Sequence, residues 1–164
     1  FLRRLGGFTL IEMIIVMVIL SLAAMMIVPM LSSAGSVQVG SAANALAGDL
    51  EYAKSMAITR GKYYSVVFDK NNERYWITDE AGTVIKDPIS RKDYLRDLPA
   101  EGLDKVDIVS ADFDGTSAIK FDYLGSPYNA SGAALLSGVV TLEASGCVIT
   151  VGVEPVTGLV TISE

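Results

Sequence analysis

The feature that most constrains this chain is a long apolar segment close to its start. No charged residue lies between Glu12 and Asp49, and residues 13–31 contain only one hydroxyl and one proline among apolar side chains. As a helix, residues 8–31 would measure about 36 Å, which is enough to cross the ~30 Å hydrocarbon core of a bilayer. The segment predicts one transmembrane helix, followed by a separate domain that carries the charged residues.

The residues before this segment predict its orientation and its fate. Arg3 and Arg4 precede it, and because basic residues stay on the cytoplasmic side of a span, we expect the bulk of the chain to lie outside. A secretory signal peptide places its small-residue cleavage site after the apolar region. Here the small pair Gly6-Gly7 comes first, so a cut after Gly7 would leave the apolar helix in the mature chain as an anchor.

Glu12 is a carboxylate inside the predicted span. At mid-bilayer such a charge costs on the order of 2.5–3.5 kcal/mol on insertion scales, and less near the interface. Two interpretations stay open. Either Glu12 lies at headgroup depth, where the helix dipole favours a negative charge, or it pairs with the free amine that cleavage would create on Phe8, four residues away. In a packed bundle the same carboxylate could reach the amine of a neighbouring chain.

The residues Gly-Phe-Thr-Leu-Ile-Glu from Gly7 to Glu12, followed by an apolar helix with Pro29, resemble the start of type IV pilins and type II secretion pseudopilins. The resemblance implies cleavage after Gly7 by a prepilin peptidase, N-methylation of Phe8, and pairing of Glu12 with an adjacent subunit's amine during assembly. Because Pro29 lacks an N–H, we expect the helix to bend or loosen there. Since the chain does not begin with Met, we expect residues 1–7 to be a truncated, cleaved leader.

After the apolar segment, the pattern predicts a hinge and then an amphipathic continuation of the helix over residues 32–61. Residues 32–40 are small, polar and glycine-containing, which predicts a weak helix or an extended join. From residue 41 onward, apolar residues recur at steps of three and four and fall on one helical stripe. The stripe consists of Ala43, Leu46, Leu50, Ala53 and Ala57. We expect it to cover a sheet, and Gly61 to end the helix.

Residues 62–164 carry short runs typical of β-strands and are expected to form a β-rich head domain. The runs lie at 63–69, 74–79, 106–110, 119–123, 138–142, 148–153 and 159–162, and turns at 69–73 and 154–158 join the first two and the last two. The predicted fold class is α+β: a long N-terminal helix, membrane-spanning in its first half, packs by its second half on a small antiparallel β-sandwich-like head.

Two segments of the head domain are expected to be irregular. Residues 87–105 are charged and contain two prolines, which predicts a long surface loop that either contacts a partner or is a tolerated insertion. Residues 125–138 are rich in small residues and are expected to be flexible, and they could contact either a neighbouring subunit or nothing.

The head domain resembles that of GspH/FimT-type pseudopilins. The resemblance rests on residues 46–68 (LAGDLEYAKSMAITRGKYYSVVF), 119–125 (IKFDYLG), 139–143 (VVTLE) and the terminal CVITV and TGLVTI runs. Some pilus members of this family bind DNA through basic residues after the final Thr-Gly. Here Thr157-Gly158 is followed by Leu159, Val160 and Thr161, which weakens the expectation of DNA binding for this chain.

Composition excludes several functions. The net charge is −6, and the residues after Glu12 carry 11 basic and 18 acidic groups, a net of −7 that disfavours nucleic acid as a partner. The chain has no histidine, and we assign no catalytic residue, cofactor or metal. Cys147 alternates with apolar residues and is expected to be a buried, unreactive thiol. Asp112 and Asp114 match the start of a calcium loop without its closing Glu, so a turn is expected.

Together these features predict a minor pseudopilin, a structural subunit of a type II secretion pseudopilus, and no enzyme. It would be a single-pass protein of the bacterial inner membrane with its head in the periplasm. Its expected partners are other pseudopilins or pilins and the prepilin peptidase. The alternative is a minor pilin of a type IV pilus, which shares all the N-terminal chemistry. The sequence disfavours a competence-type DNA-binding pilin and a membrane-anchored hydrolase.

Overall fold

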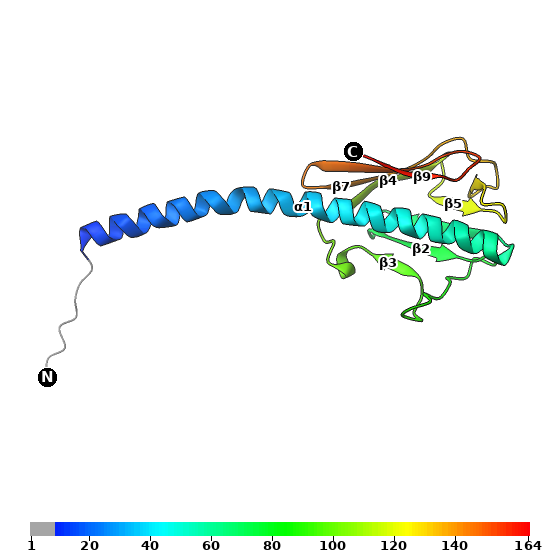
Figure 1. Ribbon diagram of the computed structural model, residues 1–164, viewed down its shortest axis with the longest axis horizontal. Helices are drawn as coiled ribbons and strands as arrows, with labels where there is room; N and C mark the ends of the chain where they lie inside the picture. Colours follow the sequence, from blue (N-terminus) through cyan, green and yellow to red (C-terminus); the bar gives the residue numbers. More distant parts are fainter. Residues whose placement is uncertain (1–8) are drawn as a thin grey trace. The chain divides into compact units, whose positions relative to one another are not determined.

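The structure is a computed structural model that describes residues 9–164, apart from the side chains of Ala24 and residues 26–34. Helix α1 (Leu10–Arg60) comes first and strands follow (Figure 1). The strands are β1 (Tyr64–Asp69), β2 (Arg74–Thr78), β3 (Leu95–Asp97), β4 (Asp107–Phe113), β5 (Ala118–Phe121), β6 (Pro127–Asn129), β7 (Gly138–Ala144), β8 (Cys147–Val153) and β9 (Val160–Ser163). A short 3-10 helix, η1 (Pro99–Glu101), precedes β4.

The chain divides into two compact units, Phe1–Ala34 and the head unit, Gly35–Glu164. In the first unit, the apolar side chains from Leu10 to Leu22 are between 44% and 78% exposed, on every side of the helix. A helix that is apolar all round needs lipid or other helices around it.

Across the described residues, no helix meets both the length and the hydropathy that a membrane crossing demands. The predicted span, residues 8–31, lies partly outside them, since Phe8 and the side chains of Ala24 and residues 26–31 are not described. The predicted leader, residues 1–7, lies outside them entirely.

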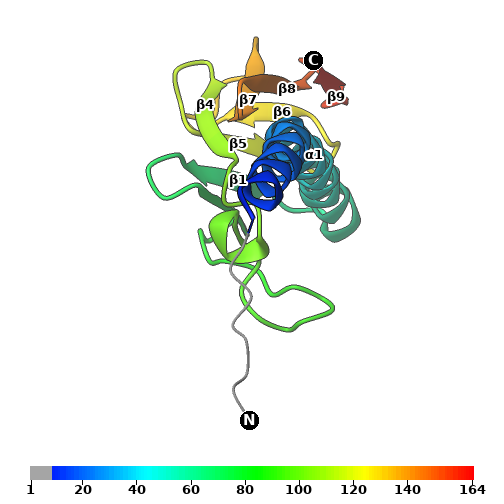
Figure 2. The same cartoon turned by 90° about the vertical axis from the view of Figure 1, so that its left-hand side faces the viewer.

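The second half of α1 carries the predicted apolar stripe. Each member is at most 1% exposed: Ala43, Leu46, Leu50, Ala53 and Ala57. Figure 2 shows this part of the helix alongside the strands that it covers. The backbone is helical across residues 32–40, so the alternative of an extended join is wrong. Gly61 follows the last helical residue with a φ of 64°, the left-handed conformation that ends many helices at glycine.

The strands form two antiparallel sheets with the orders β3-β2-β1-β5-β6 and β4-β7-β8-β9. Burial alternates along β1 and β7, so each sheet turns one face to the core. Phe68 of β1 and Phe113 of β4 stack with ring centroids 5.6 Å apart and join the two sheets. The fold is α+β with a sandwich-like head, as the sequence predicts, and all seven predicted strands are present.

Two segments that the sequence predicts to be irregular contain short regular elements. Residues 87–105 are not one long loop, because they hold β3 and η1, and residues 125–138 hold β6. β3 and β6 are three residues long, too short to show an alternating pattern. Both are defined by pairing with β2 and β5, which a local pattern does not reveal.

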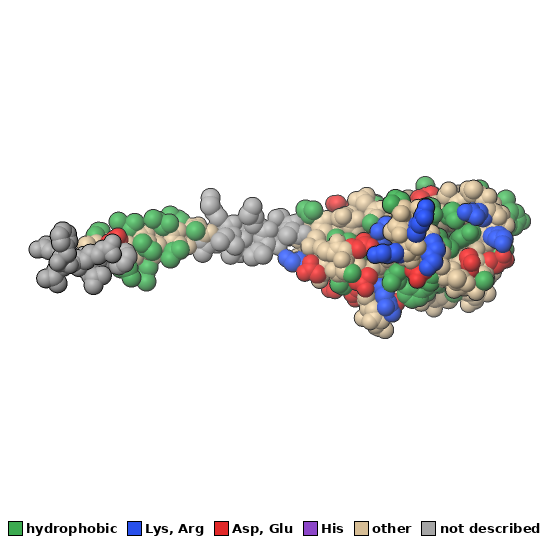
Figure 3. All heavy atoms as spheres, turned by 90° about the horizontal axis from the view of Figure 1, so that it is seen from below, with side chains coloured by type: hydrophobic (Ala, Val, Ile, Leu, Met, Phe, Trp, Pro, Cys, Tyr) green, Lys and Arg blue, Asp and Glu red, His purple; other side chains and the backbone are tan. Residues whose placement is uncertain are grey.

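The surfaces of the two units differ in character. In the first unit, the described side chains of α1 seen in Figure 3 are mainly apolar. The acidic Glu12 lies in the first turn of the helix. On the face of the head unit seen in Figure 3, basic and acidic side chains are interspersed. Such a mixed surface lacks the single-sign field that concentrates a polyanion.

Candidate functional site

The first candidate site is the start of α1, where Thr9 and Glu12 cap the helix reciprocally. The Glu12 backbone N–H donates to Thr9 Oγ1 at 3.3 Å, and the Thr9 N–H donates to Glu12 Oε2 at 3.4 Å. This Thr-x-x-Glu arrangement satisfies two N–H groups that a helix start otherwise leaves unpaired. The Glu12 carboxylate therefore lies at the positive end of the helix dipole, with Oε1 left for another donor.

The other predicted site residues lie beyond what the structure describes. Gly7 and Phe8, the predicted cleavage and N-methylation residues, are outside the described range. Pro29 lies within α1 by its backbone, but its side chain is not described, and the predicted bend stays a prediction. The capping pair with Thr9 was not predicted, although the Thr-x-x-Glu spacing is a local signal that could have revealed it.

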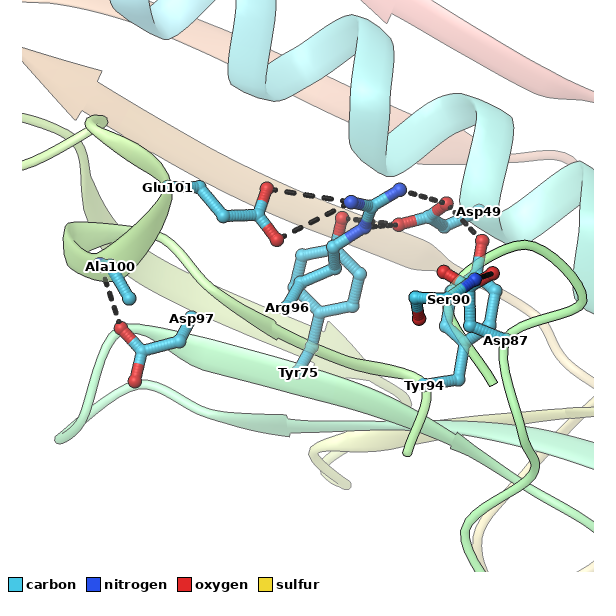
Figure 4. A network of polar contacts seen from close by, with 9 residues as sticks. All are labelled: Asp49, Tyr75, Asp87, Ser90, Tyr94, Arg96, Asp97, Ala100 and Glu101. Atoms are coloured by element: carbon cyan, nitrogen blue, oxygen red, sulfur yellow. Dashed lines mark hydrogen bonds and ion pairs between the residues drawn. The ribbon is translucent and has the colours of Figure 1, made fainter. Parts of the chain in front are cut away.

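The second candidate site is a polar network in the head unit, centred on the Asp49 carboxylate (Figure 4). Asp49 is 4% exposed and accepts hydrogen bonds from the Tyr75 hydroxyl at 2.8 Å and the Tyr94 hydroxyl at 2.7 Å. Arg96 donates to the same carboxylate through Nε at 2.9 Å and Nη2 at 3.4 Å. Arg96 Nη1 also donates to Glu101 at 3.3 Å. One helix residue thus joins α1 to β2, β3 and η1.

The three side chains that donate to Asp49 stay protonated near neutral pH. Burial, reinforced by the Asp49 carboxylate, raises the pKa of Tyr75 well above its ordinary value. Burial and the hydrogen bond to Asp49 raise the pKa of Tyr94 in the same way. The hydrogen bond to Asp49 raises the pKa of Arg96. Because none of the three donors titrates near pH 7, the network can hold the fold but is unsuited to acid–base catalysis.

Sequence reasoning missed this network, although one signal was available. Asp49 lies in the apolar stripe of α1, one residue before Leu50 and three after Leu46. A carboxylate on the buried side of a helix requires partners. The identity of those partners could not be read from the sequence, because Tyr75, Tyr94 and Arg96 lie 26 to 47 residues further along the chain.

The remaining acidic and thiol candidates have structural surroundings. Asp112 Oδ1 accepts the Gly115 N–H at 2.7 Å, and both oxygens of Asp114 accept backbone N–H groups of residues 136–137. In residues 9–164, where described, no group of His, Cys, Asp and Glu could hold a metal ion. Cys147 faces the core, as predicted, but is half-buried and not fully enclosed.

Two family models match the chain. One describes a prokaryotic N-terminal methylation motif and matches residues 2–28. The other describes type II transport protein GspH and matches residues 42–155. No curated protein matches.

Two solved structures share the fold. The minor pseudopilin EpsH from the type 2 secretion system of Vibrio cholerae has a TM-score of 0.55 at 12% identity, over 77% of this chain and 96% of that one. The type IV minor pilin FimU of Pseudomonas aeruginosa has a TM-score of 0.50 at 16% identity, over 79% of this chain and 90% of that one.

Proposed function

Because this chain belongs to the type II transport protein GspH family, we propose that it acts as a minor pseudopilin, a structural subunit of a type II secretion pseudopilus. The observation that carries this proposal is the combination, in one chain, of an N-terminal methylation motif and a GspH head. The motif belongs to subunits that are anchored and then assembled, and the head supplies contacts to other pilin-like subunits. A structural role, not an enzymatic one, follows from both.

The N-terminal segment is proposed to be the anchor. Residues 8–31 would lie in the inner membrane and the head unit in the periplasm, since Arg3 and Arg4 keep the start of the chain in the cytoplasm. The exposed apolar side chains of α1 support this, because lipid can surround them before assembly and neighbouring helices afterwards. A prepilin peptidase would cut after Gly7, and Phe8 would then be N-methylated.

Glu12 is proposed to set the position of the subunit in the filament. Its carboxylate already accepts the Thr9 N–H within the helix and has one oxygen left. The amine released on Phe8 of an adjacent subunit can donate to that oxygen, which neutralises a charge that is costly among apolar helices. This ion pair would then fix how far one helix is shifted along its neighbour.

Glu12→Ala tests this assembly role. The variant is expected to insert into the membrane normally but to lose incorporation into filaments, measured by crosslinking to other pilin-like subunits in cells. Glu154→Ala removes an exposed carboxylate of the head unit and is the matched control, which should incorporate like the wild type. Incorporation of the Glu12 variant at the control level would rule out the pairing, and mass spectrometry of the mature N-terminus checks cleavage separately.

The second candidate function is a minor pilin of a type IV pilus, which the fold shared with FimU favours. Deletion of the gene separates the two: loss of protein secretion supports the pseudopilin, and loss of surface pili supports the pilin. DNA binding is not proposed, since Leu159, Val160 and Thr161 follow the final Thr-Gly. A gel shift at low salt is expected to show no retarded DNA.

A further inference from the structure

The two sheets of the head unit have four edge strands, β3, β6, β4 and β9. An edge strand presents backbone N–H and C=O groups that can pair with another chain. Proteins usually prevent this with short strands, charges, prolines, bulges or covering segments. An edge without such protection is therefore a place where a strand from a partner can add to the sheet.

Both edges of the five-stranded sheet are protected. β3 is three residues long and contains Arg96, which Asp49 and Glu101 hold. β6 is also three residues long and begins with Pro127, which has no N–H. The following segment covers β6, because the Asn129 N–H donates to the Ala133 carbonyl at 2.9 Å and the Leu135 N–H donates to the Pro127 carbonyl at 3.1 Å.

The edge of the four-stranded sheet at β4 is protected as well. Its register with β7 shifts between Ile108 and Ser110, which marks a β-bulge. The Glu73 carboxylate accepts the Ile108 N–H and so occupies a backbone donor of this strand. Asp107 and Asp112 add two exposed charges to β4. A strand that approached this edge would meet a bulge and carboxylates.

β9 differs from these three edges. Its sequence Val-Thr-Ile-Ser has no charge and no proline, and it pairs with β8 in unbroken register over four residue pairs. Within the described residues, no backbone hydrogen bond reaches the side of β9 that faces away from β8. Ile162 lies opposite the buried Val151, on the core side of the sheet, and yet is 41% exposed. An additional strand would cover it.

We propose that β9 pairs with an edge strand from the head of a different pilin-like subunit and so extends the four-stranded sheet from one head into the next. This inference rests on the proposed function, which supplies the class of partner. The chemistry of β9 defines the strand that fits: it is uncharged, contains no proline at the paired positions, and places an apolar side chain beside Ile162.

For antiparallel pairing, strand directions argue against a second copy as the partner. The turn before β8 lies beside the start of α1 in the head unit, because a Cβ on Gly35 would lie 2.3 Å from Ser145 Oγ. The turn after β8 lies beside Lys54, whose Nζ donates to the Gly158 carbonyl at 2.9 Å. β8 therefore runs in the direction of this part of α1, and antiparallel pairing makes β9 run against it and β4 along it.

Two copies joined by antiparallel β9 strands would have α1 helices in opposite directions, whereas subunits anchored in one membrane share one direction. Antiparallel pairing of β9 with β4 of the next copy keeps the helices in one direction, but β4 is blocked by its bulge and by Glu73. The partner that antiparallel pairing leaves is a different subunit with an open edge that runs along its own α1. Because the β9 edge is open and the β4 edge is blocked, copies of this chain cannot join head to head in a continuous series. The chain can instead occupy the last position in a series of paired heads.

A photo-crosslinking residue introduced in place of Ser163, in the full chain expressed in cells with its secretion genes, tests the proposal. The expected adduct is with another protein that carries the N-terminal methylation motif. Ile162→Lys should lower the adduct yield at least tenfold. Val148→Lys is the matched control, since Val148 is 45% exposed on the central strand β8, and its adduct yield should equal that of the unsubstituted chain.

Three results would overturn the proposal: no adduct with a pilin-like subunit, an adduct with a second copy, or an undiminished adduct in Ile162→Lys. If that variant does not fold, Thr161→Lys, on the exposed outer face of β9, replaces it with the same expected loss. Failure of the proposed function is distinguishable, because a gene deletion that leaves secretion and pili intact refutes the function whatever the adduct. Normal dependence of secretion on the gene without an adduct refutes only the β9 contact.

Discussion

Asp49→Asn is the substitution for which the structure gives the clearest expected magnitude. The exchange keeps the shape of the side chain but removes the charge that holds Arg96, and it replaces one acceptor oxygen by a donor group. Removing one member of a buried ion pair costs about 3–5 kcal/mol. The Arg96 side chain is 33% exposed and keeps its bond to Glu101, so solvent screening reduces the expected loss of unfolding free energy to about 2–3 kcal/mol.

Thermal unfolding of the full chain in detergent micelles, followed by the fluorescence of its single tryptophan, Trp76, measures this loss. For a chain of this size, each kcal/mol corresponds to about 2–4 °C, so the expected decrease in Tm is about 4–12 °C. Asp93→Asn is the control, because it removes the Lys86 partner in an ion pair whose side chains are 61–67% exposed. Its expected effect is about 0–0.5 kcal/mol.

A local measurement separates the network from a general loss of stability. Tyr94 bonds to Asp49 and stacks on Tyr52 of α1 with ring centroids 5.3 Å apart, and both contacts hold the segment that precedes β3. Trypsin is expected to cut at the exposed Arg91 and Lys92 several times faster in Asp49→Asn than in Asp93→Asn. Equal Tm values and equal cleavage rates in the two variants would refute the role assigned to Asp49.

Two further predictions concern the close approach of α1 to the β7–β8 turn and the pH dependence of stability. Gly35→Ala should lower the unfolding free energy by about 1–3 kcal/mol, because its Cβ would lie 2.3 Å from Ser145 Oγ. Gly48→Ala, in the same helix with nothing within 4 Å, should raise it by about 0.5–1 kcal/mol, and thermal unfolding compares the two. Because the pKa values of Tyr75 and Tyr94 are raised in the folded chain, the folded state holds more protons above pH 10. The contribution of these tyrosines to the unfolding free energy is therefore fully present below pH 10. Above pH 10 it falls by up to about 1.4 kcal/mol per pH unit for each tyrosine. Unfolding of Tyr75→Phe beside the wild type across pH 9–12 would measure this fall.

Local patterns explain what the sequence could predict. The stripe from Ala43 to Ala57 and the alternating strands depend on residues a few positions apart, so their periodicity is visible without knowledge of the fold. The methylation motif is also local, since Gly7 and Glu12 lie within one short run. These features were enough to predict the fold class and the family.

What could not be predicted depends on contacts between distant parts of the chain. β3 exists because three of its residues pair with β2, and Arg96 in that strand reaches Asp49 across 47 residues of sequence. The open edge at β9 is likewise a property of sheet order, because Val-Thr-Ile-Ser reads in sequence like any short strand. Only the order of strands determines whether such a run lies in the centre of a sheet or at its edge.

The contrast between Asp49 and Glu12 explains why one carboxylate is suited to hold the fold and the other to change partners. Both oxygens of Asp49 accept hydrogen bonds at 2.7–3.4 Å, from Tyr75 of β2, Arg96 of β3 and Tyr94 just before β3. Loss of these donors would leave the buried carboxylate charge unpaired. Glu12 is exposed, and among the described residues only one of its oxygens accepts a hydrogen bond, from the Thr9 N–H at 3.4 Å. A stronger donor, such as a charged amine, can therefore take over Glu12 at little cost, and the N–H groups at the helix start can turn to other acceptors. An assembly contact that forms only after cleavage requires an acid of this second kind.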